Sequence, residues 1–187
     1  MSKDYILRGF PRQSLTDDLA VRTGPMESPV DIAYREGRTY RTSLRVNLPS
    51  NSSELYIKYA TTGDTDLTLS SIACNKGAVL YEVFVASQAS GETAITTPIP
   101  IYRRNNKSDT VVRPSTMVLT RNIVGGGTLT LAGEPNSVVL VRTDKKDLTV
   151  YGDDSRRGFP AGTFYVRVKG LEGDNNIILD QEWIEYD

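Results

Sequence analysis

The segment at residues 40–48 alternates between two kinds of side chain without a break. One series is Tyr40, Thr42, Leu44, Val46 and Leu48, and the other is Arg41, Ser43, Arg45 and Asn47. Successive side chains of a β-strand point to opposite faces, so this period of two predicts a strand. We expect the first series to pack on a core and the second to face solvent or a partner.

Comparable short segments recur about every ten residues from there to residue 186, separated by Gly, Pro, Asn and Asp. No helical pattern lies between them, and such spacing is typical of β-sandwiches and jelly rolls. A chain of 187 residues has room for one full-sized domain. We therefore predict an all-β protein with a β-sandwich of jelly-roll type over residues 37–187.

Two finer expectations follow from the same pattern. The turn residues 75–77, Asn-Lys-Gly, predict a hairpin between the strands on either side of them. The predicted core contains one residue or more from most strands: Tyr40, Leu44, Val46, Leu69, Val83, Leu140, Phe164 and Val166.

Residues 1–36 differ from the rest because prolines and glycines interrupt them and only residues 14–20 could form a helical turn or two. We interpret this segment as an extended N-terminal arm, with a frayed tail as the alternative. Its apolar side chains are costly to leave in water, so we expect them to contact another subunit. These predicted interface residues are Tyr5, Ile6, Leu7 and Phe10.

Charge and composition exclude several classes of function. The net charge of −1 is too balanced for a protein that mainly grips nucleic acid, and no apolar run approaches membrane-spanning length. The chain has no histidine and a single cysteine, Cys74, which we expect to be a buried, inert thiol. A Cys/His zinc site cannot be assembled, and the commonest general base is missing. We expect no cofactor, and neither nucleic acid nor membrane as partner.

Three groups of residues invite a chemical interpretation, and a structural one is favoured for each. Residues 125–127 are glycines, but a strand pattern follows them instead of the lysine and helix of a phosphate loop. Acidic turns that could hold calcium also suit ordinary turn chemistry; they contain Asp64, Asp66, Asp153, Asp154, Glu172 and Asp174. Glu182 and Glu185 are three apart, so a strand points them to opposite faces and they cannot act as a hydrolytic pair.

The charges are unevenly distributed along the chain. Residues 170–187 contain six acids and no base, whereas residues 102–121 contain five bases and one acid. This asymmetry favours self-association or docking to a complementary protein surface. The predicted basic interface consists of Arg103, Arg104, Lys107 and Arg113.

Short motifs over residues 38–187 resemble virion proteins of tailed bacteriophages. These motifs are the Leu-Tyr-Glu strand at residues 80–82, the Arg/Asn/Ser loop at 103–108, and an acidic aromatic end, Glu-Trp-Ile-Glu-Tyr, at 182–186. The resemblance implies a sandwich that decorates and cements the outside of a capsid, often as a trimer. The implied partners are the major capsid protein and other copies of the chain, and the implied location is the virion exterior.

The resemblance and the composition together predict a capsid decoration protein without enzymatic activity. A tail or head–tail connector component is the alternative within the virion. Trp183 and the ten tyrosines keep a carbohydrate-binding module open as an alternative of another class.

Overall fold

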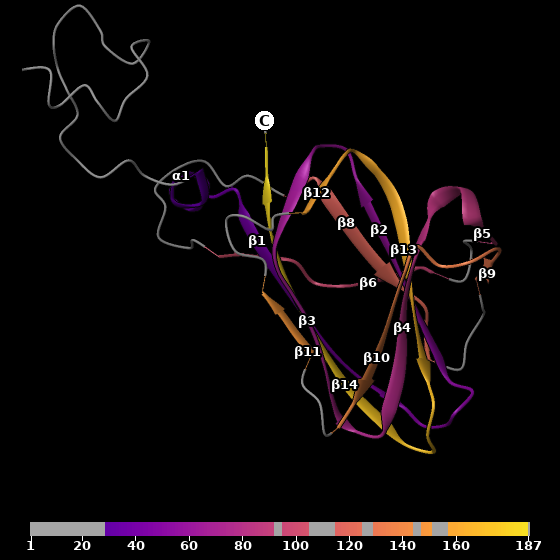
Figure 1. The fold of residues 1–187 in the computed structure, drawn as a ribbon. Helices are drawn as coiled ribbons and strands as arrows, with labels where there is room; N and C mark the ends of the chain where they lie inside the picture. Colours follow the sequence, from indigo (N-terminus) through magenta and orange to yellow (C-terminus); the bar gives the residue numbers. More distant parts are fainter. Residues whose placement is uncertain are drawn as a thin grey trace, which may run out of the picture.

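The computed structural model describes residues 29–91, 95–104, 115–124, 129–143, 147–150 and 157–186. One helix, α1 (Pro29–Arg35), and one 3-10 turn, η4 (Ala86–Gln88), occur in these residues, and every other regular element is a β-strand (Figure 1). Within the described part, no helix has the length and apolar character needed to cross a membrane.

Most strands belong to two antiparallel sheets that face each other (Figure 1). Sheet A contains, in order, β11 (Asp147–Val150), β3 (Thr65–Lys76), β14 (Asn175–Glu185), β1 (Thr39–Leu48) and β7 (Tyr102–Arg103), with β12 (Arg157–Phe159) also paired to β3. Sheet B contains, in order, β10 (Ser137–Arg142), β4 (Ala78–Val85), β13 (Gly162–Gly170), β2 (Glu54–Thr61), β8 (Met117–Arg121) and β6 (Thr97–Pro98). A small third sheet pairs β5 (Ala89–Ser90) with β9 (Thr130–Leu131).

The strand order is that of a jelly roll. The chain crosses between the sheets at each of the first three connections, so β1 and β3 lie in sheet A while β2 and β4 lie in sheet B. The strands β13 and β14 run back along β2 and β1, and β10 and β11 run back along β4 and β3. Two interlocked four-stranded sheets result, β11-β3-β14-β1 and β10-β4-β13-β2. The predicted all-β sandwich is confirmed.

The predicted hairpin at residues 75–77 is wrong. Gly77 does turn the chain, with a positive φ of 81°. However, β3 and β4 belong to different sheets and do not pair. Asparagine and glycine indicate that a chain reverses, but they do not determine whether the flanking strands pair or cross between layers.

Most of the predicted core is confirmed. Tyr40, Leu44, Val46 and Val166 are buried between the sheets, and Val83 and Phe164 pack against them partly buried.

Leu69 does not belong to this core. The register of β3 against β14 shifts between Glu182 and Trp183, where a bulge leaves one extra residue on β3. Leu67 therefore points inward opposite Trp183, whereas Leu69 lies opposite Glu182 on the outer face.

The prediction that Leu140 is a core residue is also wrong. Leu140 is 44% exposed, and its neighbour Val141 is fully buried. The apolar run at residues 138–141 contains no polar residue to mark the solvent side. Period two alone then cannot decide which face points inward.

The last part of the predicted arm differs from an extended chain. Residues Pro29–Arg35 form α1, and its end is a Schellman motif: the Arg38 amide donates to the Ala33 carbonyl, and the Gly37 amide donates to that of Tyr34. Ala33 is fully buried. This part of the segment therefore lies on its own domain. Residues 1–28 are outside the described residues.

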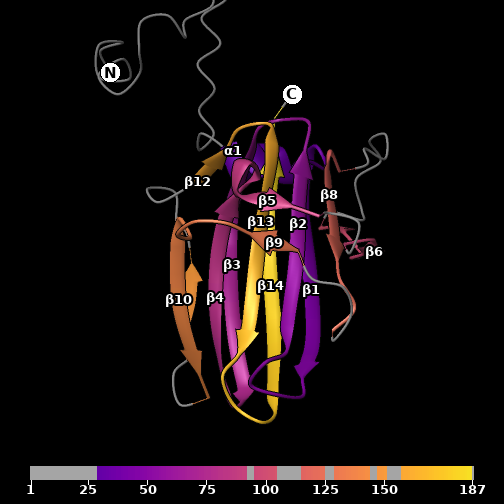
Figure 2. The same ribbon diagram turned by 90° about the vertical axis from the view of Figure 1, so that its right-hand side faces the viewer.

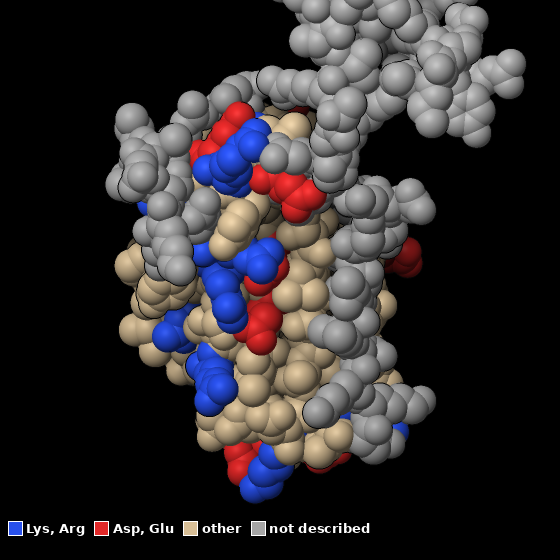
Figure 3. All heavy atoms as spheres, turned by 90° about the vertical axis from the view of Figure 1, so that its left-hand side faces the viewer, with Lys and Arg blue, Asp and Glu red and all other residues tan. Residues whose placement is uncertain are grey.

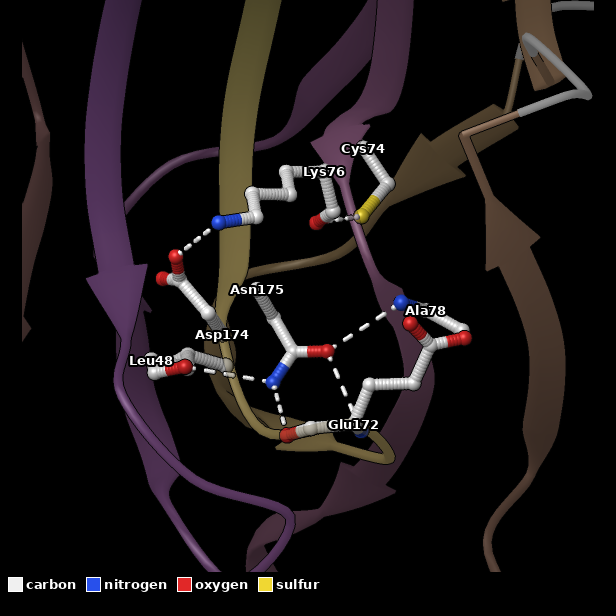
Figure 4. A network of polar contacts seen from close by, with 7 residues as sticks. All are labelled: Leu48, Cys74, Lys76, Ala78, Glu172, Asp174 and Asn175. Carbon is white, nitrogen blue, oxygen red and sulfur yellow. Dashed lines mark hydrogen bonds and ion pairs between the residues drawn. The ribbon is translucent and has the colours of Figure 1, made fainter.

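Asn175 fastens one end of the sandwich (Figure 4). Its side-chain amide donates to the carbonyls of Leu48 and Glu172 at 3.1 and 2.8 Å. Its side-chain oxygen accepts from the amides of Ala78 and Glu172 at 3.1 and 3.2 Å. One buried side chain therefore joins the end of β1, the start of β4 and the turn before β14. Beside it, Lys76 forms an ion pair with Asp174.

Candidate interaction surface on the outer face of sheet A

Strand β1 presents two arginines on the outer face of sheet A. Tyr40, Thr42, Leu44 and other even-numbered residues of β1 are buried, and this places Arg41 and Arg45 on the opposite, exposed side. Their backbone is fixed by continuous pairing with β14 along the whole strand. The Cα atoms that carry the two cationic side chains are therefore about 13 Å apart, at 3.3 Å per residue.

A cross-strand row adds an exposed aromatic ring to this face. Arg41 lies directly opposite Tyr102 on β7 and opposite Glu182 on β14. Tyr102 is 59% exposed. Arginine and tyrosine are among the residues that are enriched at protein interfaces, because each offers a large contact area together with hydrogen-bonding groups.

Glu182 is already neutralised by another arginine. Nη1 of Arg104 lies 2.9 Å from Oε2 of Glu182, and the Arg104 guanidinium also stands 5.9 Å from the centre of the Tyr34 ring. Arg41 and Arg45 form no ion pair with any other described residue. Figure 3 shows the result: a column of Lys and Arg side chains runs down this face beside a few acids. The face therefore carries guanidinium groups that can donate hydrogen bonds to carboxylates of a partner.

On the outer face of sheet B, by contrast, the central arginine forms an ion pair within the domain. Arg167 lies opposite Glu82, and Nε of Arg167 is 2.6 Å from Oε2 of Glu82, which is buried. This hydrogen bond raises the pKa of the Arg167 guanidinium. Arg167 is thus committed to a contact within the domain, in contrast to Arg41 and Arg45.

The predicted basic interface is only partly brought together. Arg104 lies on the outer face, but Arg103 lies opposite the buried Tyr40 and packs half-buried near Gly37. Adjacent residues of a strand point to opposite faces, so the two arginines separate. Lys107 and Arg113 lie outside the described residues, as do the predicted arm residues Tyr5, Ile6, Leu7 and Phe10.

The Arg104–Glu182 ion pair shows that part of the charge asymmetry along the sequence is neutralised within the molecule. It joins the basic stretch to the acidic end within one molecule. The exposed residues on this side of the molecule include Arg41, Arg45, Tyr34 and Tyr102. The alternation at residues 40–48 already indicated that Arg41 and Arg45 face solvent or a partner.

Several acidic turn residues have structural partners. Oδ1 of Asp64 accepts from the Ala161 amide at 3.2 Å, and Oδ2 of Asp66 accepts from the Tyr186 hydroxyl at 2.8 Å. No group of three or more potential metal ligands occurs in the part of the chain that the structure describes. Asp153, Asp154 and the glycines at residues 125–127 are outside that part.

Glu182 and Glu185 point to opposite faces, as predicted. Glu185 is buried, and its carboxylate accepts from the Ser115 hydroxyl at 2.5 Å, the Thr116 amide at 2.8 Å and the Trp183 indole at 3.0 Å. Its role is to hold residues 115–117 against the sandwich. Its donors leave it without the open position that an acid–base catalyst needs.

Cys74 is buried, as predicted. Its thiol donates to the Lys76 carbonyl at 2.9 Å (Figure 4). Burial raises the pKa of the Cys74 thiol, which lowers its reactivity.

Comparisons with known proteins add little to this description. No protein-family model and no curated protein matches the chain. A crystal structure of hydroquinone 1,2-dioxygenase PnpCD in complex with Cd2+ and 4-hydroxybenzonitrile is similar to 78% of the chain, at 15% identity and a TM-score of 0.27. The match spans 57% of the length of that protein's chain. A likeness this weak carries no argument about function.

Proposed function

We propose that this chain is a non-catalytic structural protein of a tailed-bacteriophage virion that binds and stabilises the outside of the capsid. The resemblance of residues 38–187 to such proteins supports a location in the virion. The jelly-roll sandwich supports a role as a rigid structural component. The partners are the major capsid protein and other copies of the same chain.

The outer face of sheet A is the observation that carries the proposal. Arg41, Arg45 and Tyr102 are exposed on a sheet whose strands are paired along their length. Because the backbone that carries these side chains is already fixed, binding of a partner has to order the side chains but not the chain that presents them. The docking site on the shell would supply carboxylates opposite the arginines.

Two features favour this proposal over a carbohydrate-binding module or an enzyme. Trp183, the ring that could stack on a sugar, is 1% exposed and stacks on Tyr40 inside the core. The two carboxylates near the end of β14 serve the fold, Glu185 inside the sandwich and Glu182 in its ion pair with Arg104.

A binding assay with capsids lacking this protein tests the proposal. Purified full-length chain is mixed with such capsids, and the bound copies are counted after sedimentation. Arg45→Glu should weaken binding by about tenfold or more, and Arg41→Glu combined with it should weaken binding further. Lys169→Glu is the matched control, because it makes the same charge change on the outer face of sheet B and should bind like the wild type.

Each outcome of the assay bears on the proposal. Capsids that do not bind the wild-type chain would overturn capsid decoration, and purified tails tested in parallel would identify a tail or connector component. Equal losses for Arg45→Glu and Lys169→Glu would show that binding does not use the outer face of sheet A.

A further inference from the structure

Strand β10 forms one edge of sheet B. It pairs with β4 over residues 137–142, and no other described strand pairs with its outer side. Figure 2 shows β10 at the margin of the sheet, with the other strands to one side of it. Its outer row of backbone groups can therefore accept another strand.

The side chains of β10 are apolar on both faces. Val138 and Leu140 point to the outer face and are 53% and 44% exposed, and Val139 is only partly buried although it packs against the core. Leu80, directly opposite Leu140 on β4, extends this apolar surface inward along the sheet. Charge occurs only at the end of the strand, on Arg142.

Edges of natural sheets are normally protected by charge, proline or short length. Strand β1 illustrates that protection. On the side away from β14 its only described strand partner is β7, at Tyr40 and Arg41, but its outer face carries Arg45 as well as Arg41. A second copy of β1 brought alongside it would place like charges close together. Strand β10 has no proline, and its only charged residue is Arg142 at its end.

The sequence of β10 is self-complementary in one register. In an antiparallel pair, residues directly opposite each other lie on the same face. When β10 is placed beside its own twofold copy with Val139 on the axis, Val138 lies opposite Leu140 of the copy, and Leu140 lies opposite Val138. Both exposed apolar side chains then gain an apolar partner on the outer face.

The two neighbouring registers that keep the faces matched are worse. An axis at Leu140 places Val138 opposite Arg142, and an axis at Val138 places Leu140 opposite the exposed Asn136. A shift by one residue places outer-face residues opposite core-face residues. The register at Val139 is therefore the one that the side chains favour.

We infer that two copies of this chain associate through β10, antiparallel and centred on Val139, so that their two B sheets become one continuous sheet. The contact is isologous and closes with two copies. It does not depend on the proposed contact with the capsid, because β10 and the arginine face belong to different sheets.

Solution mass measurements test the association. The full-length chain should be dimeric by light scattering after gel filtration, with a fraction of monomer that rises on dilution. Val138→Lys combined with Leu140→Lys should weaken dimerisation by roughly a hundredfold, because four apolar side chains per dimer are replaced by charges. The matched control, Val118→Lys with Ile123→Lys, changes two side chains that are 58% and 70% exposed elsewhere in sheet B and the segment after it, and should stay dimeric.

Cysteine cross-linking tests the register itself. In the predicted pairing, residue 139 lies opposite its own copy at a Cα separation of about 5 Å, within disulfide range. The single variant Val139→Cys should therefore form a covalent dimer on mild oxidation. Val138→Cys alone should not, because its copy would lie about 8 Å away, beyond the limit of about 7 Å.

Circular dichroism of each variant confirms that it is folded before its mass is interpreted. A wild-type chain that stays monomeric at the highest soluble concentration overturns the inference. So does a dimer that the Val138/Leu140 double variant leaves intact. Cross-linking through Val138→Cys in preference to Val139→Cys would refute the register.

Discussion

Trp183 donates its indole N–H to Oε1 of Glu185, 3.0 Å away, and both side chains lie inside the sandwich. They are two residues apart on β14 and so share the inner face. The contact connects the largest buried ring of the core to the carboxylate that holds residues 115–117.

Glu185→Ala should lower the free energy of unfolding by about 2–4 kcal/mol, because it leaves the buried Trp183 indole and the part-buried donors of Ser115 and Thr116 without their acceptor. Glu182→Ala is the control on the same strand. It removes only the part-exposed ion pair with Arg104 and should cost under about 1 kcal/mol. Urea unfolding measures both, and similar costs would mean that Glu185 does not anchor this end of the sandwich.

Asn175→Ala should cost about 2–4 kcal/mol, since it removes four hydrogen bonds between the side chain and the backbone of Leu48, Ala78 and Glu172. The neighbouring Asn176 is exposed, so Asn176→Ala should change stability by less than about 0.5 kcal/mol. Thermal unfolding of the pair is the measurement. A stable Asn175→Ala protein would show that backbone pairing alone closes this end.

Val166→Ala should cost about 2–3 kcal/mol, because Val166 is fully buried between the sheets and its truncation leaves a cavity. Val118→Ala makes the same chemical change at a side chain that is 58% exposed, and should cost under about 0.5 kcal/mol. The difference between the urea midpoints of the two variants measures how much the burial of Val166 contributes to stability. Equal midpoints would contradict the packing described for β13.

Stability should decline as the pH rises above about 10, the pKa of tyrosine in an unfolded chain. Burial raises the pKa of Tyr59, whose hydroxyl donates to Oε1 of Gln181 at 2.6 Å. The unfolded chain therefore releases this proton at a pH where the folded chain still holds it, which favours unfolding. Tyr59→Phe should reduce the slope of unfolding free energy against pH in this range. Tyr102→Phe, at a ring that is 59% exposed, is the control, and an identical reduction there would contradict the assignment.

Local patterns predicted faces well where polar residues mark one side. At residues 40–48 the alternation placed Tyr40, Leu44 and Val46 inside and Arg41 and Arg45 outside, as the structure has them. The same reasoning failed for Leu140, in an apolar run with no polar marker, and for Leu69, where a bulge that depends on the partner strand reverses the phase.

Relationships between distant segments could not be predicted from the sequence. The crossing of the chain at Gly77 depends on which strands occupy the neighbouring positions of each sheet. Two of these strands, β13 and β14, begin only at residues 162 and 175. The neutralisation of Glu182 by Arg104 has the same origin. A linear list of charges revealed an asymmetry but not that its two halves meet within one molecule.

The position of β14 has a consequence for how the chain is made. This strand sits between β3 and β1, and its pairing joins Thr39 to Ile184. A ribosome that has synthesised the chain only as far as β13 leaves β1 without its neighbour in sheet A, and apolar strand faces exposed in the nascent polypeptide. Such long-range pairing folds slowly and exposes the chain to aggregation. Premature termination between residues 170 and 175 should therefore give an insoluble product.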